Sequence, residues 1–574
     1  MDKKELALIL EEIGVILELK GENPFKSRAY YNAARQIEML NQDINALDKA
    51  GKIAEMKGIG KALADKITTL INTGELEYYS NLKESIPAGL FDLLKIPGMG
   101  PKRVKTVYEK LNISTLGELE YACRENRLRD LDGFGSKTQE NILKSIELQK
   151  KYSERFLFPV AAYEAARLAG YLRKNAGFIR LEIAGSLRRK KEVIRDIDIV
   201  ASCEEPDRNV LMDYFSAYDK KLEIVAKGPT KSTITLQAGI HADLRLVSDS
   251  EFPFTLHHST GSKEHNTAMR SRAKKMNIKM NEYGLFKADQ LIQCRDENEI
   301  FTTLDMAIIP PELRENMGEI EEAIKNNLPV LYTGKPFYGL FHVHTTYSDG
   351  ANTIAEIAEA CRNLEFSYVG ICDHSKSAIY ANGLNEDRIL AQHEEINRLN
   401  EQFKDFKIFK GIEVDILVDG SLDYGDDLLA NFDFVIASVH SNFGLSQDAM
   451  TKRICRALSH PAVTMLGHPT GRLLLGREPY AVDMMQVIET AGKLGKVIEI
   501  NTSPFRLDLD WRLGRVAKKL GVKTALNPDA HAIEGLKDYE YGIGIARKGW
   551  FEAADIINTL SAKEITAFFK KFKN

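Results

Sequence analysis

Two acidic residues form the first group in this sequence that could do chemistry. Asp196 and Asp198 lie inside residues 194–200, a run with the composition of a β-strand. Because side chains on a strand alternate between faces, both carboxylates project from the same face. Two close carboxylates repel each other, and a divalent cation relieves the repulsion. The pair predicts a metal site, although this spacing also occurs on the solvated face of edge strands.

A short anion-binding motif precedes this pair. Gly185 and Ser186 follow the apolar run 181–184 and precede two arginines, the second of which is Arg189. A strand that ends in small residues exposes backbone amides, which bind anions together with arginine side chains. We therefore expect phosphate groups to bind at this turn, beside the metal.

The second half of the chain carries histidines at spacings typical of metal ligands. Eight of the 12 histidines follow residue 341, and His342 and His344 form an H-x-H pair that places both rings on one face of a strand. Counting this pair, seven apolar runs end in polar residues. The later runs end in His374, Glu413, His440, His468, Asn501, and the pair Asp529 and His531.

The elements that position these histidines alternate along the chain. Segments with helical periodicity, such as residues 354–364, 387–403 and 511–520, separate the apolar runs. Alternating strands and helices, with chemistry at the carboxyl ends of the strands, are typical of a barrel. Seven runs predict a (β/α)7 barrel over residues 336–574.

Three copies of a glycine–apolar–glycine sequence occur in the first 150 residues, each before a helical pattern. Such a turn presents amides at the start of the second helix, where they meet a DNA phosphate without reading its base sequence. A tight turn that touches nothing is the alternative for a single copy, and three copies favour DNA. The copies are Gly58 and Gly60, Gly98 and Gly100, and Gly133 and Gly135.

Length and composition narrow the class of protein. A chain of 574 residues suggests about three to five domains. The net charge of −4 excludes a general positive field, so nucleic acid has to be bound by local donors. Six cysteines without a C-x-x-C spacing argue against a disulfide framework and fit a reducing cytoplasm. The sequence shows no signal peptide and no apolar run of about 18 residues, so we expect no membrane partner. We also expect a monomer.

The G-S-x-R-R motif followed by D-x-D resembles the nucleotidyltransferase superfamily, and most closely the polymerase beta-like family X DNA polymerases. The resemblance implies two Mg²⁺ or Mn²⁺ ions held by Asp196, Asp198 and Asp243. Arg195 stands where the family usually has glycine, and His258-Ser259 replaces an aromatic pair. The residues implied for nucleotide binding are Gly185, Ser186, Arg189, Thr260, Gly261, Asn266 and Arg270.

The first 90 residues resemble the small lyase domain of the same family. Aligned through the first hairpin, Lys66 falls at the Schiff-base lysine, and Lys26 and Tyr30 fall where that domain meets a DNA 5′-phosphate. An unprotonated lysine could attack the opened sugar of an abasic site. Ala62 stands where the family has a second lysine, and a solvated lysine on a helix face is the alternative for Lys66.

Residues 336–574 resemble the PHP (polymerase and histidinol phosphatase) domain. The resemblance implies two to three divalent metals, Mn²⁺, Zn²⁺ or Fe²⁺, with Glu413 as a bridge, which would activate a hydroxide against a phosphodiester. A barrel kept only as a scaffold is the alternative. Arg472, Arg477 and Arg506 are candidates for phosphate contacts. The implied ligands are His342, His344, Asp349, His374, Glu413, His440, His468, Asp529 and His531.

These observations predict a multidomain α/β enzyme that acts on gapped or primer-template DNA with dNTP. We expect a DNA polymerase that fills short gaps in base-excision repair and a 3′–5′ exonuclease, with abasic-site endonuclease or 3′-phosphoesterase activity as options. The alternatives are a polymerase with a purely structural barrel and a nucleotidyltransferase with a non-DNA substrate. The predicted parts are a lyase-like helical domain (1–90), a helix-hairpin-helix DNA-binding domain (91–150), an α+β palm (151–250), a nucleotide-binding subdomain (251–317), a linker (318–335) and the PHP barrel (336–574).

Overall fold

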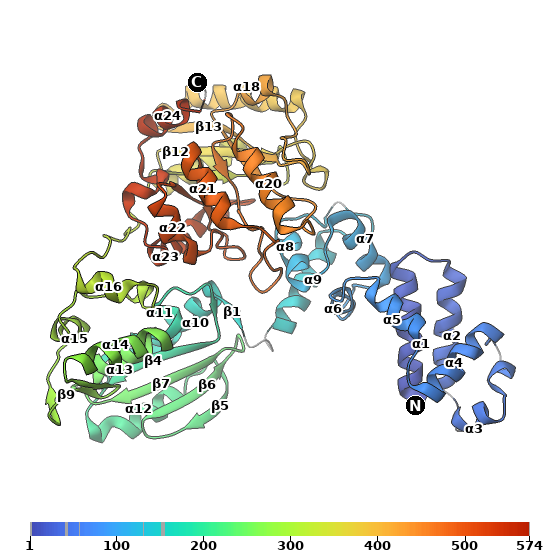
Figure 1. Cartoon of the computed structure of the whole chain (residues 1–574), viewed down its shortest axis with the longest axis horizontal. Coiled ribbons are helices and arrows are strands. Elements are labelled where there is room, and N and C mark those ends of the chain that lie inside the picture. Colours follow the sequence, from blue (N-terminus) through green and yellow to red (C-terminus); the bar gives the residue numbers. More distant parts are fainter. Residues whose placement is uncertain are drawn as a thin grey trace. The chain divides into compact units, whose positions relative to one another are not determined.

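The computed structural model describes residues 3–38, 40, 44–56, 58–129, 131–150 and 155–572. The chain divides into two compact units, Met1–Leu148 and Gln149–Asn574 (Figure 1). Within the described residues, no helix is both long enough and apolar enough to cross a bilayer. The finer domain boundaries inferred from the sequence stay predictions.

The first unit is helical. In α1, Leu6, Leu10, Ile13 and Leu17 recur at helical spacing and are buried against α2 and α4. A second core, which includes Leu93, packs α6 to α9. The helices are α1 (Lys3–Leu19), α2 (Pro24–Glu38), α3 (Ile44–Lys49), α4 (Lys61–Thr73), α5 (Glu77–Glu84), α6 (Leu90–Leu94), α7 (Pro101–Leu111), α8 (Leu116–Arg124) and α9 (Ser136–Lys150).

The three glycine repeats share one geometry. The first glycine of each copy has a positive φ, 84° at Gly58, 89° at Gly98 and 82° at Gly133. The second glycine directly precedes a helix, so Gly60 caps α4 and Gly100 caps α7, while α9 begins after Gly135. Only glycine adopts the left-handed conformation without strain, which explains its place in each copy.

The palm of the second unit is a five-stranded sheet in the order β2-β4-β7-β6-β5, with β4 and β7 parallel. Ile197 and Ile199 of β4 are buried in the same core as Leu168 of α10, so Asp196 and Asp198 project from the opposite face. The elements are α10 (Phe158–Leu172), β2 (Arg180–Ile183), α11 (Gly185–Arg188), β4 (Asp196–Ser202), α12 (Arg208–Ser216), β5 (Lys221–Lys227), β6 (Lys231–Leu236) and β7 (His241–Val247). A short ribbon, β1 (Phe156–Leu157) with β3 (Val193–Ile194), joins this part.

A smaller subdomain follows the palm and has its own core around Phe301 and Leu285. Its strands form a three-stranded antiparallel sheet. The elements are α13 (Phe252–Thr260), α14 (Lys263–Lys275), β8 (Lys279–Asn281), β9 (Gly284–Lys287), β10 (Gln290–Ile292), α15 (Glu297–Thr303), η3 (Pro311–Leu313) and α16 (Glu319–Ile324).

The last part is a nearly closed barrel of seven parallel strands, β11 to β17 in sequence order. The first and last strands meet where Val343 bridges Ala530, and Phe569 of α24 packs on the barrel phenylalanines. The predicted (β/α)7 barrel is confirmed. Its strands are β11 (Gly339–Val343), β12 (Tyr368–His374), β13 (Lys407–Asp415), β14 (Phe434–Ser438), β15 (Met465–Leu466), β16 (Val497–Asn501) and β17 (Thr524–Asn527).

Helices surround this barrel, as Figure 1 shows. The predicted helix at 387–403 forms nearly in full, whereas the one predicted at 511–520 is divided into a 3₁₀ turn, η5 (Trp511–Leu513), and a short α-helix. The helices are α17 (Ile354–Asn363), α18 (Glu386–Gln402), α19 (Asp426–Leu429), α20 (Gln447–Leu458), α21 (Met484–Leu494), α22 (Gly514–Lys519), α23 (Tyr539–Lys548) and α24 (Ala562–Lys570).

Candidate active sites

Glu413 lies at the centre of the histidine cluster in the barrel. Its Oε1 lies 3.2 Å from His342 Nε2, 3.2 Å from His440 Nε2 and 2.9 Å from His468 Nε2. Its Oε2 lies 2.9 Å from His374 Nδ1. One buried carboxylate therefore meets four imidazoles from four strand ends, which is the position of a bridging ligand.

The remaining predicted ligands complete the cluster. His344 Nε2 lies 3.1 Å from Asp529 Oδ1, and the His344 and His531 rings stack with their centroids 4.1 Å apart. The described residues contain four overlapping groups whose ligand atoms lie within 4.8 Å of one another. The nine predicted residues are brought together in these groups, which are His344, Asp349, His374 and His531; His342, Glu413 and His468; His342, His344 and Asp529; and His374, Glu413 and His440.

The donor atoms fit a cationic group. Within the described part of the chain, His344 Nδ1 and His374 Nε2 are buried without a hydrogen bond. Unsatisfied buried polar atoms are costly, and a metal ion satisfies imidazole lone pairs. The mixture of imidazole and carboxylate, without thiolate, suits divalent metal ions.

Burial and neighbouring charges shift the pKa values of His344 and His440 in opposite directions. Burial, then the neighbouring imidazoles His531 and His374, lower the pKa of His344 to about 3. Burial opposes the charged form of His440, but Glu413 and Asp415 outweigh it and raise its pKa to about 9. A metal ion binds the unprotonated ring, so metal binding would release a proton from a histidine whose pKa is raised, such as His440.

Two acidic residues orient the His342 and His440 rings by contacting their Nδ1 atoms. Glu499 Oε2 lies 2.6 Å from His342 Nδ1, and Asp415 Oδ1 lies 2.5 Å from His440 Nδ1. In both rings this leaves Nε2 directed at Glu413. Such outer contacts fix ring orientation and raise ligand basicity. The sequence prediction missed both roles, although Asp415 follows Glu413 by two residues on one strand.

The loop arginines differ from one another. Arg472 is buried, and its guanidinium donates to the carbonyl of Arg506 and to Asp510, so it joins two loops and does not face solvent. Arg477 lies over the Phe443 ring. Arg506 Nε lies 3.6 Å from Oδ2 of Asp529, beside the ligand cluster. Arg506 is therefore placed beside a predicted ligand.

In the palm, the strand register brings the predicted carboxylates together. Asp198 on β4 is paired with Asp243 on the parallel strand β7, as expected from the sequence. Burial, then the charges of Asp196 and Asp243, raise the pKa of Asp198 to about 6. Crowded carboxylates of this kind fit a divalent cation, which would supply the missing positive charge.

Two residues that the sequence prediction missed contact the carboxylate of Asp243. Thr233 Oγ1 donates to Asp243 Oδ1 over 2.5 Å, and Lys231 Nζ lies 2.7 Å from Asp243 Oδ2. None of the four tight ligand groups in the described residues lies in the palm. The palm carboxylates are therefore arranged more loosely than the barrel ligands.

Position 185 requires glycine because its backbone lies close to the Asp198 carboxylate. Its φ is +63°, and an added Cβ would lie 2.0 Å from Asp198 Oδ2. The turn predicted at residues 185–189 is a short helix, α11, followed by Arg189. Arg189 donates to Glu315 over 2.9 Å and to the Thr260 carbonyl over 2.7 Å. The anion motif and the Thr-Gly segment are thus joined directly.

The rest of the predicted nucleotide-binding set lies on α13 and α14. Asn266 donates to the carbonyls of His258 and Gly261 over 2.8 and 3.2 Å, while Arg270 is exposed one turn later on α14. Ser186 is half-buried within α11. The contact of Arg189 with the Thr260 carbonyl brings these two segments together, although they are far apart in sequence.

In the first unit, Lys66 lies in a small polar–aromatic pocket. Its Nζ donates to Tyr30 Oη over 2.7 Å and lies 3.5 Å from the centroid of the Tyr78 ring. Burial, then the charge of Lys26, lower the pKa of Lys66. Lys66 is therefore not the fully solvated lysine of the alternative interpretation. Tyr78 was not predicted, because no local spacing connects it to Lys66.

A palm with paired aspartates, joined to a barrel with a histidine cluster, defines a nucleotidyltransferase-like enzyme with a second metal centre. Family models match the helical first unit, the subdomain after the palm and the barrel. They are the helix-hairpin-helix domain (residues 1–76), the SAM-like helix-hairpin-helix tandem (90–148), the DNA polymerase beta thumb (255–315) and the PHP domain (341–503).

Similar proteins identify the family. The chain is 37% identical over 575 residues to the DNA polymerase/3′-5′ exonuclease PolX of Bacillus subtilis (strain 168), covering 100% of both chains. It belongs to the PolX family, the family X DNA polymerases that carry a PHP domain, which confirms the resemblance seen in the sequence.

Other similarities are partial. A probable phosphatase of Thermoanaerobacter sp. (strain X514) is 30% identical over 229 residues, covering 38% of this chain and 89% of that protein. A structure described as Leishmania infantum polymerase beta in a ternary P/T complex is 20% identical and covers 40% of this chain and 100% of that one, with a TM-score of 0.27. At that score it adds nothing to the description of the fold.

Proposed function

We propose that this chain synthesises DNA at the palm and removes nucleotides from DNA 3′ ends at the barrel, filling short gaps in base-excision repair. The observation that carries the proposal is the 37% identity, over the full length of the chain, to a DNA polymerase/3′-5′ exonuclease. The acidic cluster of the palm and the histidine cluster of the barrel lie in the matching parts. The substrates would be gapped or primer-template DNA and dNTP.

At the palm, Asp196, Asp198 and Asp243 would hold Mg²⁺ or Mn²⁺. When bound, the ions lower the pKa of the primer 3′-hydroxyl and neutralise the triphosphate. The amides of Gly185 and Ser186 face the phosphates, and Arg189 adds a positive charge near them. Its bond to the Thr260 carbonyl links phosphate binding to the segment that would hold the sugar.

At the barrel, the nine clustered residues would hold two or three divalent metals. Metals held there would activate water for attack on a phosphodiester and stabilise the leaving oxygen. Glu499 and Asp415 hold the His342 and His440 rings in position. Arg506, beside Asp529, supplies a positive charge for the phosphate being cleaved.

A pair of substitutions tests whether the two sites are independent. Asp198→Ala is expected to lose primer extension on a gapped duplex with Mn²⁺ and to keep nuclease activity, and His344→Ala is expected to do the reverse. Both variants should keep the wild-type circular dichroism spectrum. Loss of nuclease activity in Asp198→Ala, with no effect of His344→Ala, would refute the assignment of the two activities.

For the first unit, we propose lyase activity with Lys66 as the nucleophile. The lowered pKa of Lys66 favours the free amine, and Lys26 would meet the 5′-phosphate. Borohydride should trap a covalent adduct with abasic DNA in the wild type and not in Lys66→Ala. Equal trapping in Lys61→Ala, an exposed lysine on the same helix, would control for nonspecific imines. A full yield of adduct in Lys66→Ala would exclude this lysine.

A second candidate for the barrel is removal of a terminal 3′-phosphate. The similarity of this part of the chain to a probable phosphatase favours it. A primer that ends in a 3′-phosphate should become extendable in the wild type and stay blocked in His344→Ala. If the wild type leaves the phosphate in place while degrading a 3′-hydroxyl primer, the barrel is a nuclease only.

A further inference from the structure

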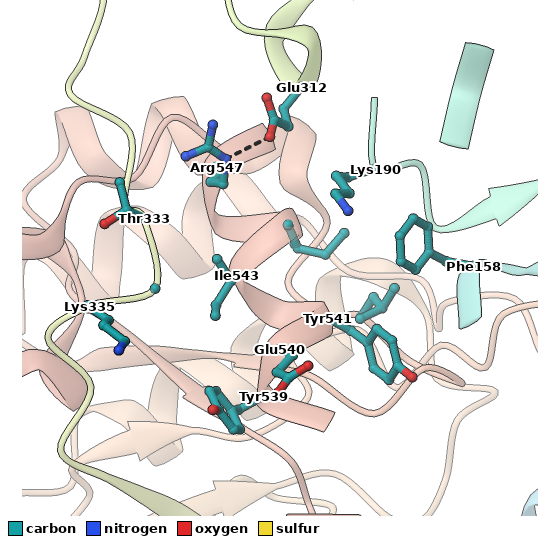
Figure 2. Close-up of a pocket in the computed structure, with 14 residues that line it drawn as sticks. Phe158, Lys190, Glu312, Thr333, Lys335, Tyr539, Glu540, Tyr541, Ile543 and Arg547 are labelled. Carbon is teal, nitrogen blue, oxygen red and sulfur yellow. Dashed lines mark hydrogen bonds and ion pairs between the residues drawn. The ribbon is translucent and has the colours of Figure 1, made fainter. Parts of the chain in front are cut away.

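A cavity of about 420 Å³ lies between the palm and α23 of the barrel part. Both walls belong to the second compact unit. The palm supplies Phe158 and Lys190, and the segment before the barrel supplies Thr333 and Lys335. Figure 2 shows α23 running between these two groups, with Lys190 and Phe158 at one end of the cavity and Lys335 at the other.

The middle of the cavity is apolar and aromatic. Tyr541 and Ile543 of α23 line it together with Leu507. The Phe158 and Tyr541 rings meet edge to face, with centroids 6.2 Å apart. A pocket of this volume with an aromatic lining suits a small planar group, and nucleobases stack on such rings without regard to sequence.

The two ends of the cavity are cationic. Lys190 Nζ lies 5.1 Å from the centroid of the Phe158 ring, and neither Lys190 nor Lys335 forms a salt bridge with any residue that the structure describes. By contrast, Arg547 is paired with Glu312 over 2.7 Å. Glu540 also lines the cavity and is exposed. An anion on each side of a planar group would therefore meet a lysine.

Close packing places Lys190 in this wall. An added Cβ at Gly544 of α23 would lie 3.3 Å from Cβ and Cγ of Lys190, so the aliphatic stem of the lysine lies against the helix backbone. Lys190 follows Arg189 of the proposed phosphate-binding turn. Leu507 follows Arg506, which lies 3.6 Å from the proposed ligand Asp529. The cavity is thus adjacent in the chain to both proposed sites.

We infer that this cavity binds one unpaired nucleotide of a DNA strand, with its base against the wall that Tyr541 and Ile543 line and its flanking phosphates near Lys190 and Lys335. A nucleotide within a strand carries a phosphate on each side, which matches lysines at the two ends better than a free mononucleotide does. The inference goes beyond the proposed function, and its test requires no catalysis.

The experiment measures binding by the full-length protein in EDTA, which keeps both proposed catalytic sites silent. The probe is a duplex with 2-aminopurine as the penultimate residue of a short unpaired 3′ tail, and a matched blunt duplex is the reference. Stacking on the aromatic wall should quench the tail fluorescence in the wild type. Lys190→Met/Lys335→Met should weaken tail binding about five- to tenfold, since two phosphate contacts are lost.

Matched variants separate this site from general charge effects. Lys174→Met/Lys537→Met removes the same charge from exposed lysines outside the cavity lining and should bind the tail as the wild type does. Tyr541→Leu should lose most of the quenching, and Tyr541→Phe should restore it. Binding of the blunt duplex should change less than twofold in all four variants.

Two outcomes would overturn the inference, one in its choice of ligand and the other as a whole. Quenching of free 2-aminopurine deoxyribonucleoside monophosphate, without quenching of the tail, would keep the site but assign it to a released mononucleotide and overturn the strand assignment. If the cavity variants and the exposed-lysine variants bind the tail equally, and Tyr541→Leu quenches fully, the cavity binds no nucleotide. Activity on gapped DNA could then still follow the proposed function.

Discussion

Gly185→Ala tests how the turn at the head of α11 supports the palm carboxylates. An alanine Cβ would lie 2.0 Å from Asp198 Oδ2 and 3.0 Å from its Cγ, about 1 Å inside normal contact, so the carboxylate has to move by about that distance. The φ of +63° adds about 1–2 kcal/mol of backbone strain for any residue with a Cβ. A misplacement of about 1 Å at a reacting centre costs about 100-fold in rate.

We therefore expect Gly185→Ala to lower kcat for primer extension about 100-fold and to leave nuclease activity unchanged. The assay is single-turnover extension on a gapped duplex, with urea unfolding measured in parallel. Gly170→Ala is the matched control, because its Cβ meets nothing within 4 Å on the exposed face of α10, and alanine stabilises a helix by up to about 1 kcal/mol. Extension by Gly185→Ala within about threefold of the wild type would refute the reasoning.

Three other predictions follow from buried charges. Glu413→Gln should lose at least one bound metal by plasma mass spectrometry and lose nuclease activity, because four imidazoles face this carboxylate. Glu489→Gln, at an exposed position of α21, should keep both the metal and the activity. Equal metal content in the two variants would contradict a bridging role. Lys548 is buried against Glu315, which also contacts Arg189. Lys548→Met should therefore cost about 3–5 kcal/mol in unfolding free energy and raise KM for dNTP, and an unchanged KM would separate Lys548 from nucleotide binding. In metal-free protein the pKa of Asp198 is about 6, above its value in the unfolded chain, so the contribution of Asp198 to stability is full below about pH 4 and is lost as the pH rises through 6. Asp198→Asn should remove this pH dependence from the unfolding free energy measured between pH 4.5 and 7.5. An identical pH dependence in both proteins would assign the effect to another group.

The sequence alone determined those features of the sites that depend on the spacing of residues within one strand or turn. Asp196 and Asp198 share a face because strand side chains alternate. The three glycine pairs predicted three similar turns, and their φ values agree. Seven apolar runs ending in polar residues predicted the barrel, because parallel strands bring their carboxyl ends to one edge.

Only the tertiary structure decided which distant groups meet. Glu499 orients His342 across 157 positions of the chain, Tyr78 covers Lys66, and Glu315 lies between Arg189 and Lys548. Nothing in local spacing connects these residues. Their contacts depend on packing of whole elements, since burial makes an unpaired charge costly and so selects partners that only the folded chain can supply.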